Sequence, residues 1–487
     1  MTTTSPQAPA ESTSSRSRWL ALYVLCLGDL MIVLDQSIVN VALPSIRTDL
    51  GFSQASLAWV VNAYLLTFGG FLLLGGRLGD LFGHRRLFLL GITLFTAASL
   101  ACGLSTSQNM LIAARAVQGL GGAVVSAVAL SLLLLLFQEP AERTKAMGFF
   151  GFVMAGGGSI GVLLGGVLTD VLSWHWIFLV NIPVGIAVFA LCLPLLPADR
   201  EREGSRGPVD VAGAVTITAA LILAVYAIVN GNGNGWLSAE TLGLLGLAVV
   251  LFGVFLTIEA RVAAPLVPLG LFRNRNLSVA NGVGVLWSAG MFAWFFFAAQ
   301  YLGLVLGYDP LHVGLAFLPA NIIMGAFSLG LSARIVMRFG TRLPIGVGMA
   351  LVSLGLLLFA RAPVNGSFWL DVLPGMVILG VGVGMAMNPV LIAAMSDVEP
   401  SESGLASGIV NTGFMMGGAL GLAVLASLAA WRTGSLGSAT DPVALNGGYH
   451  LAFVVGAVFA GLASALAVVL LRDRALQPHG STEPAYE

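Results

Sequence analysis

The sequence predicts an all-α polytopic membrane protein. Of its 487 residues, 57% are hydrophobic and only 9% are charged, whereas soluble domains carry about 25% charged residues. Apolar runs of about twenty residues recur along the chain, which is the length that crosses a bilayer core of about 30 Å. The short alternating segments of a membrane β-barrel are missing from the sequence. These observations exclude a soluble globular fold and favour membrane-spanning helices.

Fourteen apolar segments are expected to form these helices. In chain order they cover residues 19–43, 55–75, 87–104, 110–136, 146–169, 176–196, 211–230, 239–259, 277–302, 311–333, 343–361, 371–396, 404–430 and 449–471.

Basic residues predict the orientation, because cytoplasmic connections carry an excess of Lys and Arg. With both termini in the cytoplasm, eighteen basic side chains lie inside and only Arg47, Arg361 and Arg432 lie outside, while Arg115 falls within a helix. A missed helix early in the chain would destroy this bias. Arginine also greatly outnumbers lysine, of which Lys145 is the single example, a bias typical of GC-rich bacterial genomes. We therefore expect a multi-pass protein of the bacterial cytoplasmic membrane.

The chain contains an internal repeat. RLGDLFGHR (77–85) and RIVMRFGTR (334–342) share the pattern R-[LI]-x-x-x-F-G-x-R at an offset of 257 residues. Such repeats are typical of secondary transporters, whose substrate site lies between the repeats near the bilayer midplane. The repeat predicts this organisation: N-terminal tail 1–18, six-helix bundle 19–197, linker 198–210, extra helix pair 211–259, linker 260–276, six-helix bundle 277–474 and C-terminal tail 475–487.

Three charged residues are embedded in the apolar segments, namely Asp29, Asp35 and Arg115. Each costs about 2.5–3.5 kcal/mol at a helix centre, so such residues are functional by default. A structural Asp–Arg pair is the alternative. At 1.5 Å per residue, Asp29 lies about 15 Å into its helix and Asp35 about 24 Å. Arg115 lies about 9 Å below the outer boundary. Asp35 and Arg115 should therefore share a depth, with Asp29 deeper.

The two acids are expected to face different ways. At about 100° per residue, Asp29, Gln36 and Asn40 fall within about 20° of one line, and Asp35 is about 120° away. We hypothesise that Asp29 faces a central cavity, while Asp35 faces a neighbouring helix or the cavity wall beside Arg115.

Glycines mark two further features. In the connection 76–86, Gly76, Gly79 and Gly83 permit a tight turn, and Asp80, Arg85 and Arg86 can form charge-assisted bonds that latch the second and third helices to their neighbours. In the segment GFVMAGGGSIGVLLGGVL, small residues repeat at four-residue spacing and should let another helix approach closely. The residues on that face are Gly157, Gly161, Gly165 and Gly166.

Several stretches together resemble a known family. They are LDQSIVNVALP (34–44), GRLGDLFGHRR (76–86), LIAARAVQGLGGA (111–123), the glycine-rich segment, WHWIFLVNIPVG (174–185) and NTGFMMGGALG (411–421). The chain resembles, over essentially its whole length, the fourteen-spanner drug:proton antiporters (multidrug efflux transporters) of the major facilitator superfamily. The resemblance implies two six-helix halves plus two extra central helices. It departs at Val162, where the family often has proline, and at Phe414-Met415, where it often has Arg-Gln.

The resemblance implies roles for the motif residues. Asp35 is implied as a coupling residue, and Gly76, Asp80, Gly83, Arg85 and Arg86 as a conformational gate. Burial and a nearby arginine have opposite effects on the proton affinity of an acid. We therefore expect proton coupling through Asp35, Arg115 and Asp29. Large apolar and aromatic side chains suit a lipophilic substrate, and the expected cavity residues are Asp29, Gln36, Asn40, Trp59, Asn62, Tyr64, Trp287, Phe292, Phe296 and Gln300.

The expected activity is proton-driven export of lipophilic drugs or antibiotics, cationic or neutral. The proton gradient supplies the energy, with no cofactor or metal. The expected partners are the substrate, protons and the lipid bilayer. The protein is expected to be a monomer and to bind no nucleic acid. A proton-coupled nutrient importer on the same fold is the alternative, although it would be expected to carry more polar residues in the second half. A membrane enzyme is disfavoured, since no catalytic motif is present.

Overall fold

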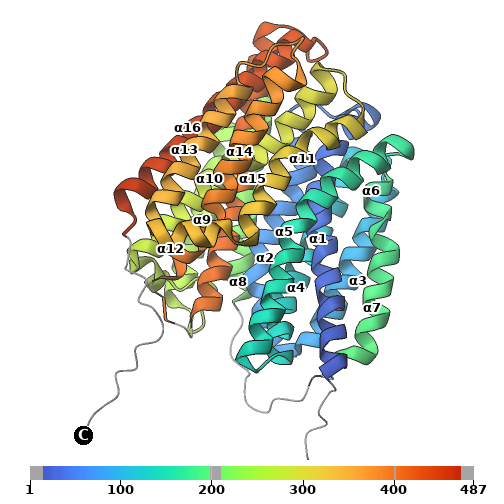
Figure 1. Ribbon diagram of the computed structural model, residues 1–487. Coiled ribbons are helices and arrows are strands. Elements are labelled where there is room, and N and C mark those ends of the chain that lie inside the picture. The colour runs from blue at the N-terminus through green and yellow to red at the C-terminus, as the bar shows by residue number, and fades with distance from the viewer. Residues whose placement is uncertain (1–14, 198, 200–209, 397, 400–401, 473–487) are drawn as a thin grey trace, which may run out of the picture.

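The computed structural model describes residues 15–197, 199, 210–396, 398–399 and 402–472, and its regular elements there are helical (Figure 1). Most of the expected tails 1–18 and 475–487 and of the linker 198–210 lies outside these residues. Thirteen helices are long and apolar enough to cross a membrane, and a shorter apolar helix, Pro310–Ala326, adds the fourteenth crossing. The expected all-α membrane fold with fourteen crossings is confirmed.

The first six crossings form the N-terminal half. Their helices are α1 (Ser15–Leu50), α2 (Ala58–Phe82), α3 (His84–Gly103), α4 (Gln108–Leu136), α5 (Pro140–Val171), and α6 (Trp176–Leu179) followed by α7 (Asn181–Leu195). Helix α5 is continuous through Val162, the position at which the family often has proline.

The extra pair comprises α8 (Val211–Asn234) and α9 (Ala239–Arg261). The C-terminal half then follows. Its elements are η1 (Leu269–Arg273), α10 (Arg275–Gln300), η2 (Tyr301–Val305), α11 (Pro310–Ala326), η3 (Phe327–Leu331), α12 (Ser332–Phe339), α13 (Arg342–Phe359), η4 (Phe368–Val372), α14 (Leu373–Met395), α15 (Ser403–Leu436) and α16 (Pro442–Leu470).

Capping side chains start two helices earlier than the expected ranges. Asp441 caps α16 by accepting a hydrogen bond from the Val443 amide, and Pro442 follows it, so α16 begins before the expected residue 449. Asp309 caps α11 by accepting a bond from the backbone N–H of His312. That bond lowers the pKa of the Asp309 carboxyl below its ordinary value.

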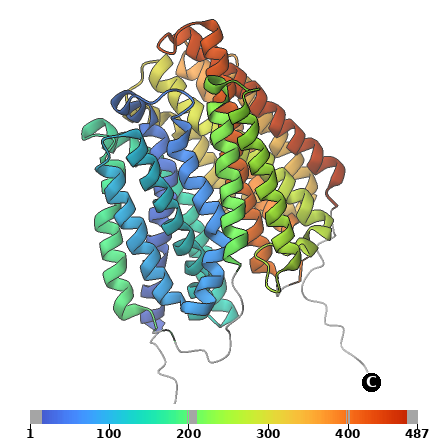
Figure 2. The ribbon, with the colours of Figure 1, turned by 180° about the vertical axis from the view of Figure 1, so that it is seen from behind.

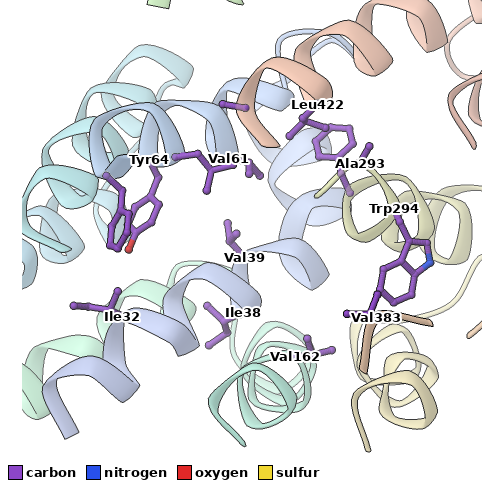
Figure 3. Close-up of a cluster of buried hydrophobic side chains, with 14 of the residues drawn as sticks. Ile32, Ile38, Val39, Val61, Tyr64, Val162, Ala293, Trp294, Val383 and Leu422 are labelled. Carbon is purple, nitrogen blue, oxygen red and sulfur yellow. The ribbon is translucent and has the colours of Figure 1, made fainter. Parts of the chain in front are cut away.

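The two halves pack through α2 against α15 and through α5 against α11. Helix α8 packs on both α2 and α15, so the extra pair covers one seam between the halves (Figure 2). One cluster of buried hydrophobic residues includes side chains of both halves, some of which Figure 3 draws. Its labelled side chains come from both halves: Ile32, Ile38, Val39, Val61, Tyr64, Val162, Ala293, Trp294, Val383 and Leu422.

One group of contacts between the halves lies at one end of the bundle, here called the distal end, where α1 finishes and α11 begins. A Cβ at Gly303 would lie 3.0 Å from Pro44, and Arg47 donates to the carbonyl of Ala439 at 3.0 Å. The opposite end holds the start of α10 and the end of α16, joined by a bond from Arg275 to the Leu470 carbonyl. The described contacts thus close the halves together at the distal end.

Glycines bring α5 against α1. A Cβ at Gly157 would lie 2.9 Å from Val33, one at Gly161 would lie 2.9 Å from the Leu34 carbonyl oxygen, and one at Gly165 would lie 2.7 Å from the Ile38 carbonyl oxygen. Gly166 faces the other way, toward the backbone of Pro310 at the start of α11. The small-residue face therefore has α1 as its partner, and Gly166 belongs to the contact between the halves.

A single methyl group tests this packing. Gly165→Ala is expected to destabilise the protein by about 1–3 kcal/mol, because the added atom meets backbone that cannot rotate away. Gly158→Ala is the matched control, since a Cβ at Gly158 meets nothing within 4 Å. Thermal unfolding in detergent measures both. Equal midpoints for the two variants would contradict the close α1–α5 contact.

Candidate functional site

An ion pair lies inside the N-terminal half. The Arg115 guanidinium bonds through Nη1 to Asp35 Oδ2 at 2.5 Å, and the two side chains are 1% and 0% exposed. Arg115 Nε donates to the Val60 carbonyl at 3.0 Å. The pair joins α1 to α4 and ties α4 to α2. Asp35 and Arg115 therefore meet at one depth, as the helix rise suggested.

Small residues on α4 allow this meeting. A Cβ at Gly121 would lie 2.7 Å from the Phe95 amide of α3, and one at Gly119 would lie 3.0 Å from Tyr64 Cα of α2. Helix α4 therefore packs backbone-close to both neighbours. Ser107 caps its start by accepting from the Met110 amide.

Two amides and one hydroxyl surround the pair. Gln118 Nε2 donates to Asp35 Oδ1 at 2.7 Å, and Asn181 Nδ2 reaches the same oxygen at 3.2 Å. Both amides also donate to Ser99 Oγ, at 2.6 and 3.0 Å. Gln118 Oε1 accepts from Arg115 Nη1 at 2.7 Å. We call Asp35, Arg115, Gln118, Ser99 and Asn181 the buried polar cluster.

Gln118, Ser99 and Asn181 were not foreseen from the sequence. Gln118 lies three residues after Arg115, so helical spacing places both on one face of α4. Asn181 begins α7 just after the break that ends α6, and it belongs to the quoted stretch WHWIFLVNIPVG. Ser99 has no comparable signal, because its role depends on how α3 packs.

An aromatic face covers Arg115. Its guanidinium carbon lies 4.4 Å from the Tyr64 ring centroid and 5.6 Å from that of Phe178. Gln36 Nε2 donates to the Tyr64 hydroxyl at 3.5 Å. Such cation–π contacts are worth more when the cation is desolvated. Tyr64 therefore links Gln36 of α1, which shares a line of that helix with Asp29 and Asn40, to the buried polar cluster.

Asp29 has a different environment. It is 1% exposed, and its Oδ1 accepts from Ser126 Oγ of α4 at 2.8 Å. Its Oδ2 is buried and has no hydrogen-bond partner among the described residues. Both acids of α1 therefore contact α4, at different depths.

The other expected cavity residues of the N-terminal half are scattered. Asn40 donates to the Gln36 carbonyl of its own helix at 3.1 Å. Asn62 is fully buried, and no described residue bonds its amide atoms. Trp59, expected in the central cavity, lies beside the extra helix pair. There it packs 6.4 Å from Tyr226 of α8 and lines an apolar pocket with Ile222.

The second half contributes an aromatic group. Trp287 and Phe292 of α10 lie 5.0 and 5.7 Å from Phe414 of α15. Phe414 stands where the family often has arginine, so an apolar ring fills the place of a cation. Phe296 is fully buried against Phe297. Gln300 faces α16, where its Oε1 accepts from the Tyr449 hydroxyl at 3.4 Å.

Polar contacts hold the connection 76–86. Asp80 lies 3.3 Å from His84 Nε2, one turn along the chain. Asp199 accepts the backbone N–H groups of Arg85 and Arg86 at 3.1 and 3.0 Å.

Gly83 is required in this turn. Its φ is +96°, and a Cβ there would collide with the Asp199 carboxylate. The tight turn at Gly83 is thus present, but the Asp199 carboxylate caps α3. Asp80 itself is half-exposed. A Cβ at Gly76 would meet nothing within 4 Å.

Comparison with known proteins adds a family match. A family model described as the Major Facilitator Superfamily matches residues 25–422. The puromycin resistance protein of Streptomyces alboniger is 37% identical, over 96% of this chain and 94% of its own length. A cephamycin export protein of Amycolatopsis lactamdurans is 39% identical over 90% of each chain. The tetracenomycin C resistance and export protein of Streptomyces glaucescens is 34% identical, over 86% of this chain and 77% of its own length.

Solved structures agree on the fold. A crystallised nucleoside transporter superposes with a TM-score of 0.67 at 13% identity, covering 93% of this chain and all of its own. A transporter of the POT family gives the same TM-score at 17% identity, covering 96% of this chain and 98% of its own.

A double-mutant cycle tests the buried pair. Asp35→Asn alone is expected to lower stability by about 3–5 kcal/mol, because it leaves Arg115 charged and uncompensated. Arg115→Gln alone should do the same to Asp35. The double variant should lose less stability than the sum of the two single losses. Unfolding midpoints in detergent measure the cycle, and strictly additive losses would show that the pair contributes no coupling.

Proposed function

The chain belongs to the major facilitator superfamily, and from this we propose that it is a proton-driven antiporter that exports lipophilic antibiotics by alternating access. It is a multi-pass membrane transporter, and its relatives include antibiotic export and resistance proteins.

The observation that carries the proposal is the set of three charged side chains buried inside apolar helices. Asp29, Asp35 and Arg115 are each at most 1% exposed. Intramembrane acids and arginines are costly, and they mark ion and proton pathways. Asp35 and Arg115 with Asp29 are therefore our proton-coupling residues. Each proton that enters the cell yields about 2.3 kcal/mol per 100 mV when the exported substrate carries no charge. When a monovalent cation leaves in exchange, the pH gradient supplies the energy.

The substrate class follows from the relatives and from the second half. The named relatives confer resistance to or export puromycin, cephamycin, lincomycin and tetracenomycin C. The ring group of Trp287, Phe292 and Phe414 offers flat apolar surface to such molecules. We propose that it lines the substrate path together with Asn62, Tyr64 and the polar side chains of α1, namely Asp29, Gln36 and Asn40. Phe296, Gln300 and Trp59 would act from further away.

The distal closure fits one state of alternating access. With both termini in the cytoplasm, the distal end faces outward, and the described contacts close it. Gly76, Asp80, Gly83, Arg85 and Arg86 then lie at the cytoplasmic end, where we propose that they gate the opposite transition. Half-exposed Asp80 is free to change partner there. The protein would work as a monomer in the bacterial cytoplasmic membrane.

A susceptibility and efflux panel tests the function. In a pump-deficient bacterial host, expression should lower accumulation of puromycin, lincomycin or tetracenomycin C, and a protonophore should restore it. Asp35→Asn should abolish the effect, while Asp170→Asn, an exposed acid at the end of α5, should not. Export that survives the protonophore would overturn proton coupling. Increased accumulation of a nutrient, with no drug export, would instead favour an importer.

A further inference from the structure

We infer that Asp29, and not Asp35, carries the exchanged proton, while Asp35 stays a carboxylate held by Arg115. This inference rests on the proton-coupled export proposed above and divides the work between its two acids. The hydrogen-bond partners of the two side chains carry it.

Asp35 is bound as an anion. Its two oxygens accept from the Arg115 guanidinium and from the amides of Gln118 and Asn181. A proton on this carboxylate would cancel the charge that compensates Arg115, which would then be an uncompensated cation inside the membrane. That situation is strongly unfavourable. The buried polar cluster is therefore built to keep Asp35 ionised in this conformation.

Asp29 is bound by one neutral donor. Ser126 Oγ reaches Oδ1, and the buried Oδ2 has no partner among the residues described. An ionised carboxylate is costly when one of its oxygens is buried without a hydrogen-bond partner. A proton on Oδ2 removes the charge and leaves the Ser126 bond in place. Asp29 can therefore gain and lose a proton without dismantling a bonded network.

No cation faces Asp29 in the described part of the chain. On α1, Arg18 pairs with Glu142 at 3.0 Å and lies eleven residues away, about 16 Å along the helix. On α4, Arg115 is eleven residues from Ser126 and is bound to Asp35.

The charge of Asp29 acts on two titratable side chains, Cys26 of its own helix and Tyr64 of α2. Helices α3, α5 and α7 meet this part of α1 with apolar atoms, at Gly28, Leu30 and Val33. Their charged residues lie toward the helix ends: His84, Arg85, Arg86, Glu142, Arg143, Lys145 and Asp170.

The division also sets the stoichiometry at this site. With one acid neutralised by Arg115 and one free to titrate, one proton is exchanged per transport cycle. When the proton leaves, Asp29 is the single uncompensated charge of the three buried ones. A cationic substrate can then compensate the Asp29 carboxylate in place of the proton, whereas a neutral substrate cannot.

Infrared spectroscopy of the purified protein in lipid tests the inference without any drug. A protonated carboxyl gives a carbonyl stretching band that a carboxylate lacks. We expect the wild type to show a buried, titrating carboxyl band that disappears in Asp29→Asn and persists in Asp35→Asn. Asp170→Asn is the control and should leave the band unchanged.

Ser126→Ala separates a direct role from a structural one. Removing the hydroxyl removes the hydrogen bond to Asp29, so the band should remain and move to higher frequency. A purely structural Asp29 would give no band to move. Loss of the band in Asp35→Asn, persistence in Asp29→Asn, or absence from the wild type would each overturn the inference.

The experiment also separates this inference from the proposed function. If the band behaves as expected but no drug is exported against a pH gradient, the proposed export fails and the assignment to Asp29 stands. If drugs are exported on the proton gradient but the band belongs to Asp35, the function stands and the assignment fails.

Discussion

The ion pair between Asp35 and Arg115 is the constraint on which the N-terminal half depends. Charged side chains in the bilayer interior almost always have a partner. The residues of this pair and of the cluster around it come from four helices. Asp35 comes from α1, Arg115 and Gln118 from α4, Ser99 from α3 and Asn181 from α7. A shift of any of these helices breaks a buried polar bond. The cluster therefore favours motion of the half as a unit.

Close backbone contacts extend this rigidity to the rest of the fold. Glycines of α5 fix it on α1, and Gly166 meets α11 of the other half. The same helix thus belongs to a rigid half and to the interface that closes the distal end. Alternating access requires the second contact to open while the first holds.

The sequence predicts the crossings well because each must be about twenty apolar residues long. It also pairs Asp35 with Arg115, since helical rise alone sets their depth. It does not predict Ser99 and Asn181, whose roles depend on how α3 and α7 pack. Trp59 was placed in the cavity because aromatic residues suit a lipophilic substrate. That argument cannot tell which face of α2 meets α8.

The most direct test of proton-coupled export is drug-driven proton movement. Proteoliposomes are loaded with puromycin and a luminal pH dye, without an imposed pH gradient, and protein-free liposomes give the baseline for passive leak. Exit of the drug through the transporter must draw protons inward, so the lumen should acidify beyond that baseline and a protonophore should abolish the change. Transporter-dependent loss of puromycin with no luminal pH change beyond the baseline would contradict the account.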